Sequence, residues 1–154
     1  MPEADVDHIY DYPKGYIEDI LKSVKTIAMV GASGDKTKFS YGVLRVLHET
    51  GYQMLPVNPN PSIKEIRGLK VFHSLKEIDK PVDMVQVFRR KEEFLSVAKE
   101  AIEIKAKVLW GQIGVYDDEA AEIAKNAGLK VVMNRCPKIE LLRPFWKPRL
   151  DLKI

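Results

Sequence analysis

Several features that would mark common protein classes are scarce in this chain of 154 residues. It contains one cysteine, Cys136, so an internal disulfide cannot form. Neither a CxxC nor an HExxH spacing accompanies its three histidines. We therefore expect neither a structural metal site nor a fold held together by disulfides.

Long apolar runs and a strong charge imbalance are missing too. No stretch approaches the roughly 18 apolar residues of a membrane-spanning helix, and the first residues form no apolar leader. The formal charge is only +3, and the lysines interleave with glutamates, which is typical of a solvated surface of mixed charge. We expect a cytoplasmic protein that binds neither membranes nor nucleic acid.

The chain does contain short apolar segments of strand length that alternate with helical patterns. Five segments have the composition of strands buried on both faces: Thr26–Val30, Gln53–Val57, Val82–Phe88, Lys107–Gly111 and Lys130–Asn134. Apolar residues recur with helical spacing over residues 16–23, 43–50, 94–102 and 120–127. This alternation predicts an α/β fold, a three-layer, Rossmann-like, doubly wound and mainly parallel sheet of about five strands.

The same pattern predicts one domain over residues 1–154. It begins with a short helix and ends in a segment that docks through Phe145 and Trp146. Residues 59–80 have weaker periodicity, and we expect a short extra strand at Lys70–Phe72 there.

The loop after the first predicted strand, GASGDKTKFSYG, has the features of a phosphate cradle. Gly31 and Gly34 would let the backbone approach a ligand, and a helix beginning near Ser40 would present unpaired N–H groups. Polar side chains that could add hydrogen bonds or charge are Ser33, Ser40, Lys36 and Lys38. The alternative is that Ser40 only caps the helix and that the glycines only form a turn.

This loop differs from two common nucleotide-binding signatures. A nucleoside-triphosphatase loop needs GxxxxGK followed by Ser or Thr, whereas Asp35 follows Gly34 here. The loop is not GxGxxG either, and the second strand ends in Asn58 and Pro59 instead of the acid that holds an NAD ribose. ATP hydrolysis and nicotinamide binding are therefore disfavoured.

The other predicted strands also end in polar or aromatic residues, and parallel strands bring these ends to one edge of the sheet. Asn58 could bond an adenosine group, or it could simply form an Asn-Pro turn. Phe88 and Arg89 could flank a nucleotide or a pantetheine arm, or serve as a core residue and a surface cation. Gln112 could bond the peptide-like groups of a ligand.

The lone cysteine has two readings. Pro137 biases Cys136 away from helical geometry, so its thiol could project into the crevice, where a helix start and Arg135 would favour the thiolate. An unpaired cysteine is equally often a small buried apolar residue. We identify no base, because no histidine lies in the five loops.

Taken together, these motifs resemble the stand-alone CoA-binding domain family, which is related to the N-terminal domain of the succinyl-CoA synthetase α subunit. The segments that carry the resemblance are IAMVGASGDKTKFSYGVLRVL (27–47), VNPN (57–60), VDMVQVFRR (82–90), LWGQIGV (109–115) and VVMNRCPKIE (131–140).

The resemblance implies a role for each group of residues. It implies pyrophosphate contacts from Gly31, Ala32, Ser33 and Ser40, an adenosine pocket at Asn58 and Pro59, and Phe88 and Arg89 beside the ligand. It also places Cys136 near the CoA thiol, where a mixed disulfide becomes chemically possible. Asn134 stands where relatives carry Asp.

We therefore expect a protein that binds coenzyme A, as free CoA, a thioester or a disulfide, without catalysing a reaction. The predicted ligand is a small nucleotide cofactor, and a protein partner or a homo-oligomer is compatible with the sequence. The alternatives are an NAD(P)-dependent oxidoreductase or nicotinamide-sensing domain, and a regulatory subunit of an acyl-CoA enzyme.

Overall fold

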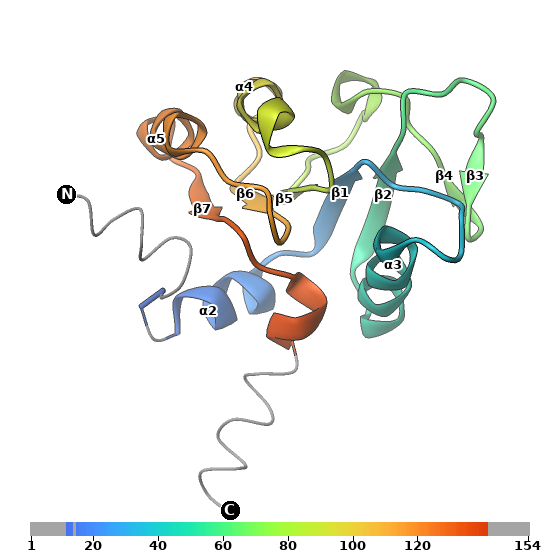
Figure 1. Cartoon of the computed structure of the whole chain (residues 1–154), viewed down its shortest axis with the longest axis horizontal. Coiled ribbons are helices and arrows are strands. Elements are labelled where there is room, and N and C mark those ends of the chain that lie inside the picture. The colour runs from blue at the N-terminus through green and yellow to red at the C-terminus, as the bar shows by residue number, and fades with distance from the viewer. Residues whose placement is uncertain (1–11, 14, 142–154) are drawn as a thin grey trace, which may run out of the picture.

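A parallel five-stranded sheet forms the centre of the protein, in a computed structural model that describes residues 12, 13 and 15–141 (Figure 1). Its strand order is β2-β1-β5-β6-β7, and every neighbouring pair is parallel. The strands are β1 (Thr26–Val30), β2 (Gln53–Val57), β5 (Met84–Val87), β6 (Val108–Gly111) and β7 (Lys130–Val132). This confirms the predicted fold class.

Helices cover both faces of this sheet. Figure 1 shows α4 (Phe94–Glu103) and α5 (Asp118–Asn126) on one face, and α2 (Tyr16–Ser23) and α3 (Phe39–Thr50) on the other. Two single-turn 3₁₀ helices, η1 (Leu75–Glu77) and η2 (Lys91–Glu93), precede α4 along the chain. None of the helices in the described part of the chain combines the length and the apolar character that a bilayer crossing needs.

The predicted boundaries need two corrections. The third and fifth predicted strands are shorter than expected, ending at Val87 and Val132. The extra strand expected at Lys70–Phe72 lies instead at Leu69–Lys70 (β4). It pairs antiparallel with β3 (Glu65–Ile66) outside the main sheet. Phe72 instead forms an isolated parallel bridge to Val57. The C-terminal segment with Phe145 and Trp146 lies outside the described residues.

Successive residues of each strand enter two separate cores, because side chains alternate across a sheet. In β1, Ile27 and Met29 pack with the residues of α2 and α3, whereas Ala28 packs on the side of α4 and α5. Both faces are thus buried, which explains why the strands are apolar throughout instead of alternating.

Two tyrosines close the exposed edge of the sheet at β7. The hydroxyl of Tyr16 accepts from the N–H of Val131 and donates to the carbonyl of the same residue, both at 3.0 Å. The hydroxyl of Tyr12 accepts from the N–H of Met133 at 2.7 Å, and its ring stacks on that of Tyr16. Burial raises the pKa of both tyrosines. These bonds satisfy backbone groups that an edge strand otherwise leaves open.

An aspartate joins the amino ends of β1, β5 and β6. The carboxylate of Asp83 accepts from the N–H groups of Lys25 (2.8 Å) and Thr26 (3.2 Å), and Lys107 lies 3.6 Å away. Burial alone would raise the pKa of Asp83, but the two backbone bonds and the cation outweigh it and lower the pKa.

Candidate functional site

A cavity of about 780 Å³ lies at the carboxyl edge of the sheet, where the loops after four strands meet the first turn of α3. Its volume is in the range of small-molecule sites. The residues that line it are Gly31, Ala32, Ser33, Lys38, Phe39, Ser40, Asn58, Phe88, Arg89, Arg90, Glu93, Gln112, Ile113 and Val115. They come from residues 31–40, the end of β2, the segment between β5 and α4, and the turn after β6.

The structure brings nine of the eleven predicted site residues to this cavity: Gly31, Ala32, Ser33, Lys38, Ser40, Asn58, Phe88, Arg89 and Gln112. Pro59 is exposed and is not among the lining residues. Cys136 is not among them either. The ligand role of each of the nine residues stays a prediction.

The backbone requires glycine at position 31 for a structural reason that the sequence did not reveal. Its φ is +94°, a conformation that other residues rarely adopt. A Cβ atom here would overlap the carbonyl oxygen of Phe88 and lie 2.9 Å from its carbonyl carbon. The N–H groups of Gly31 and Ala32 both donate to the carbonyl of Val57, at 3.1 and 3.2 Å. Gly31 therefore serves the close packing of β1 against β5, and these two amides are already engaged within the protein.

The first turn of α3 provides the donors that remain. Its N-cap is Lys38, which makes no side-chain cap bond, and no acidic residue lies in the first turn. The first N–H groups of a helix lack the acceptor one turn back, and the helix dipole makes this end positive. In this turn the N–H of Tyr41 donates to the carbonyl of Lys38 at 3.1 Å, which leaves the N–H groups of Phe39 and Ser40. Ser40 is buried inside the helix, so the alternative that Ser40 is the cap is wrong.

A hydrogen-bonded loop leads into this turn. The Ser33 hydroxyl accepts from the N–H of Asp35 at 3.0 Å. The carboxylate of Asp35 in turn accepts from the N–H and the hydroxyl of Thr37, at 2.9 and 2.7 Å, and these bonds lower its pKa. The loop thus has its own internal bonds, independent of a ligand.

Asparagines tie neighbouring loops together at this edge. Asn58 donates from Nδ2 to the carbonyl of Ala32 (2.8 Å) and accepts from the N–H of Asn60 (2.9 Å). Asn134 accepts from the N–H of Gly114 at 2.6 Å and so joins the turn after β6 to the end of β7. The Asn-Pro turn considered from the sequence is therefore present, and it fixes the position of Asn58 at the cavity.

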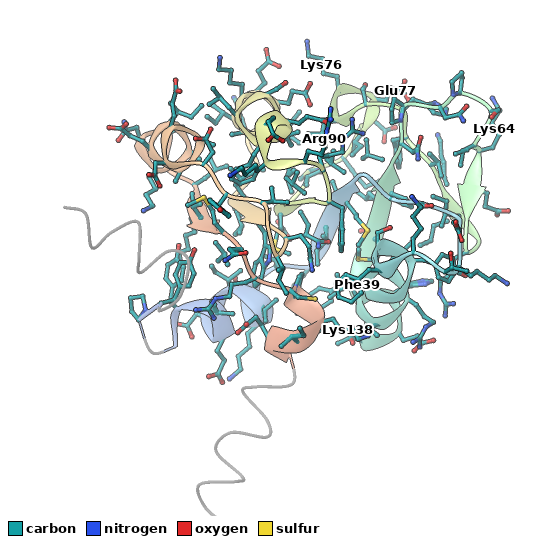
Figure 2. The ribbon with its side chains drawn as sticks, in the orientation of Figure 1. Phe39, Lys64, Lys76, Glu77, Arg90 and Lys138 are labelled. Atoms are coloured by element: carbon teal, nitrogen blue, oxygen red, sulfur yellow. The ribbon has the colours of Figure 1, made fainter. Side chains whose placement is uncertain are left out.

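The cavity also contains residues that sequence reasoning missed: Phe39, Arg90, Glu93, Ile113 and Val115. The exposed fractions of Phe39 (52%) and Ile113 (55%) are high for large apolar side chains. Figure 2 shows Phe39 at the start of α3 close to Lys138, whose Nζ lies 5.9 Å from the ring centroid. The Phe39 ring meets Phe88 edge to face with centroids 6.2 Å apart. An aromatic residue at the predicted helix start was the available signal for Phe39.

Two arginines and one carboxylate form the charged side of the cavity. Arg89 donates from Nε to Glu93 at 2.7 Å, and Arg90 donates from Nε to the other carboxylate oxygen at 3.2 Å. Arg89 and Arg90 together lower the pKa of Glu93. The spacing of four residues between Arg89 and Glu93 could have predicted this ion pair. With Lys38, the wall carries three cations and one anion.

Gln112 is the polar residue at the end of β6. It is only 3% exposed, and its Oε1 accepts from Nε2 of the fully buried Gln86 at 3.0 Å. Trp110, two residues before Gln112, is fully buried, and its Nε1 donates to the carbonyl of Arg135 at 2.8 Å.

Cys136 is a small buried residue in this structure, which is the second of the two alternatives predicted for it. The residue is 1% exposed and packs in the core below α2 and α3, with Trp110 and Val132 among its cluster. Residues 137–141 are helical, as the sequence indicated, and Arg135 pairs with Glu140 at 3.4 Å.

Known proteins are similar to this chain in sequence or in fold. A sequence model described as a CoA binding domain matches residues 25–141. The Bacillus subtilis protein YneT is 42% identical over 82% of this chain and 92% of its own length. The alpha subunit of ADP-forming acetate–CoA ligase II from Pyrococcus furiosus is 30% identical over 77% of this chain, but the match spans only 28% of that subunit.

Solved structures of other proteins have a fold similar to that of this chain. A protein from Pyrococcus horikoshii superimposes with a TM-score of 0.81 at 35% identity, covering 86% of this chain and 92% of the other. The dinucleotide-forming acetyl-coenzyme A synthetase 1 of Candidatus Korarchaeum cryptofilum superimposes with a TM-score of 0.63 at 25% identity. That match covers 71% of this chain and 26% of the synthetase.

Proposed function

Because the chain belongs to the CoA-binding domain family, we propose that the cavity at the carboxyl edge of its sheet binds coenzyme A. The observation that carries the proposal is the first turn of α3, which opens on this cavity without an acid or a side-chain cap. Such a turn favours a diphosphate, since its N–H groups and dipole both attract anions.

The charged and aromatic walls suit the rest of a nucleotide. Lys38, Arg89 and Arg90 provide positive charge for phosphate oxygens. Phe39 and Phe88 offer ring faces and edges of the kind that pack on an adenine or an aliphatic arm. Asn58 keeps one N–H and further acceptor capacity after its two bonds to the protein, so it can contact the adenosine.

The proposed role is binding without catalysis. Nucleophilic catalysis needs a nucleophile within hydrogen-bond reach of a base. The described lining residues offer serines but no histidine or cysteine, and the one carboxylate, Glu93, is held by two arginines. These residues can hold and orient a ligand, and they support a carrier, storage or sensing role.

We include a mixed disulfide of Cys136 with CoA in this proposal only for a state of the protein in which the Cys136 thiol is exposed to solvent. In that step the Cys136 thiolate attacks one sulfur of a CoA disulfide, the S–S bond breaks, and one CoA leaves as its thiolate. Because the residue is 1% exposed, we expect no adduct in the folded protein and one adduct in denaturant. Intact mass measurement after incubation with oxidised CoA, with and without urea, tests this expectation.

Calorimetric titration with CoA, NADH and NADPH tests the proposed ligand. We expect CoA to bind and the nicotinamide nucleotides to bind more weakly, since no acid follows β2 to hold a ribose. Lys38→Ala should weaken CoA binding, whereas Lys36→Ala is the matched control, because Lys36 is exposed and does not line the cavity. Preferential binding of NADH or NADPH would overturn the proposal.

A partner subunit is a further part of the proposal, because the Pyrococcus furiosus relative is named as an alpha subunit. Light scattering of the purified chain at micromolar concentration separates a monomer from a homo-oligomer. Co-expression with the genes that neighbour its own, followed by purification, tests for a stable hetero-complex.

A further inference from the structure

A short hairpin outside the main sheet lies against the loop that leads into α3. This β3–β4 hairpin spans residues 65–70, and Figure 1 shows it next to the chain that runs from β1 to α3. At Gly34, within that loop, a Cβ atom would lie 3.8 Å from Cγ1 of Ile66. Apart from the neighbours of Gly34 in the chain, no other described residue comes within 4 Å of that position. Ile66 is therefore the side chain on which the middle of the loop rests.

The loop has few other attachments to the body of the protein. Residues 34–39 are exposed. In the described part of the chain, the hydrogen bonds of Ser33, Asp35 and Thr37 all stay within residues 33–38. Asn58 holds the start of the loop through the carbonyl of Ala32. Segments with few buried contacts open easily, so the contact with Ile66 has a large share in fixing where this loop lies.

Ile66 itself is firmly held. It is 2% exposed and belongs to the core cluster beneath α3 that also contains Ala32. Arg67 and Gly68 form the turn of the hairpin with φ of +54° and +78°, the left-handed geometry of a two-residue hairpin turn. Arg67 also donates to Glu49, near the end of α3, at 2.9 Å. The hairpin is thus tied to α3 and to the core, and it can serve as a fixed support for the loop.

We propose that Ile66 is a positioning residue for CoA binding, an inference that rests on the proposed function. Ile66 does not line the cavity, whereas Ser33 and Lys38 do. By supporting the loop at Gly34, between these two residues, Ile66 keeps both of them at the cavity. Without that support the loop occupies other positions for part of the time. The apparent affinity for a ligand then falls in proportion to the fraction of molecules that remain competent to bind.

The test compares three variants by urea unfolding and by calorimetric titration with CoA. Ile66→Ala removes Cγ1, the atom nearest to the loop, whereas Ile66→Val keeps it. Ile20→Ala is the matched control for a loss of core packing. Ile20 is 0% exposed and belongs to the same core cluster, but it lies on α2 and is not a cavity residue.

We expect both alanine variants to unfold at lower urea concentration than the wild type, because each leaves a cavity in the core. Only Ile66→Ala should also lose affinity for CoA, by about five- to tenfold if the loop stays competent in about a tenth to a fifth of the molecules. Ile66→Val and Ile20→Ala should bind CoA as the wild type does.

Hydrogen exchange of the wild type, measured with and without CoA, tests the same coupling if Ile66→Ala does not fold. CoA should slow exchange in residues 65–70 as well as in residues 33–38, although the hairpin does not line the cavity. Exchange that slows in the loop alone would overturn the inference.

Two results of the titrations would also overturn the role of Ile66 while leaving CoA binding intact. One is a folded Ile66→Ala variant with the affinity of the wild type. The other is an equal loss of affinity in Ile66→Ala and Ile20→Ala, which would reflect a general loosening of the core. A wild-type protein that does not bind CoA would instead overturn the proposed function, and this inference with it.

Discussion

Replacing Gly31 with alanine should destabilise the protein strongly. The backbone there has φ = +94°, where a residue with a Cβ costs about 1–2 kcal/mol. The added Cβ would also overlap the carbonyl oxygen of Phe88 and approach its carbonyl carbon to 2.9 Å. Carbon atoms pack at about 3.5–4.0 Å, so β1 and β5 would have to separate locally.

The size of the loss follows from these two causes together. Overpacking of this kind costs about 1–3 kcal/mol. Added to the backbone strain of about 1–2 kcal/mol, the expected decrease in the free energy of unfolding is about 2–5 kcal/mol. Domains of this size have about 5–15 kcal/mol in total, so the variant should remain largely folded but unfold at much lower denaturant concentration.

Urea unfolding followed by circular dichroism measures this loss, and two further alanine variants separate its causes. Gly128→Ala has a positive φ of +95° with nothing within 4 Å of the new Cβ, so only the strain of about 1–2 kcal/mol applies. Gly34→Ala has neither cause, because its Cβ would lie 3.8 Å from Ile66 and its φ is ordinary. It should unfold like the wild type.

The reasoning would be refuted if Gly31→Ala were no less stable than Gly128→Ala. In that case the contact with Phe88 would not explain why position 31 is glycine. The close approach of a ligand would then be the better explanation. If Gly31→Ala loses stability as expected, its CoA affinity must be compared with that of the wild type under conditions where both are folded.

Four further predictions concern charge and hydroxyl groups. Tyr16→Phe removes both bonds to the β7 backbone and should cost about 1–2 kcal/mol in urea unfolding; an unchanged midpoint would contradict the edge role. Burial raises the pKa of Tyr12 and Tyr16 above 10.0, so the stability that their protonated hydroxyls contribute is complete below pH 10 and is lost as the pH rises further. The free energy of unfolding measured between pH 8 and 12 should therefore fall, and it should fall less in Tyr16→Phe. The pKa of Asp83 in the folded protein is lowered below 3.8, so the stability that its carboxylate contributes is present above that pH and is lost as the pH falls through the folded-state pKa. In Asp83→Asn, the free energy of unfolding should therefore depend less on pH in the acid range. Glu93→Gln should strengthen CoA binding several-fold in calorimetry at low salt, because it removes a carboxylate that competes with phosphate for Arg89; equal affinity would argue against a phosphate there.

The local sequence was sufficient for the elements and for the edge of the sheet that holds the site. Apolar runs such as Thr26–Val30 mark strands buried on both faces, since both their odd and even positions must enter a core. Once parallel strands are established, their carboxyl ends must meet at one edge, so the loops containing Ser33, Asn58, Arg89 and Gln112 were predictable neighbours.

What only the tertiary structure decided are relations between strands that are distant in sequence. The contact of Gly31 with the Phe88 carbonyl, the buried Gln86–Gln112 pair and the burial of Cys136 all depend on register and on which face a side chain enters. A change of one residue in register exchanges the two faces of a strand, and no local pattern of an all-apolar strand specifies that choice. The sequence by itself thus determined the fold class and the edge that forms the site, whereas packing across the sheet decided which side chains reach it.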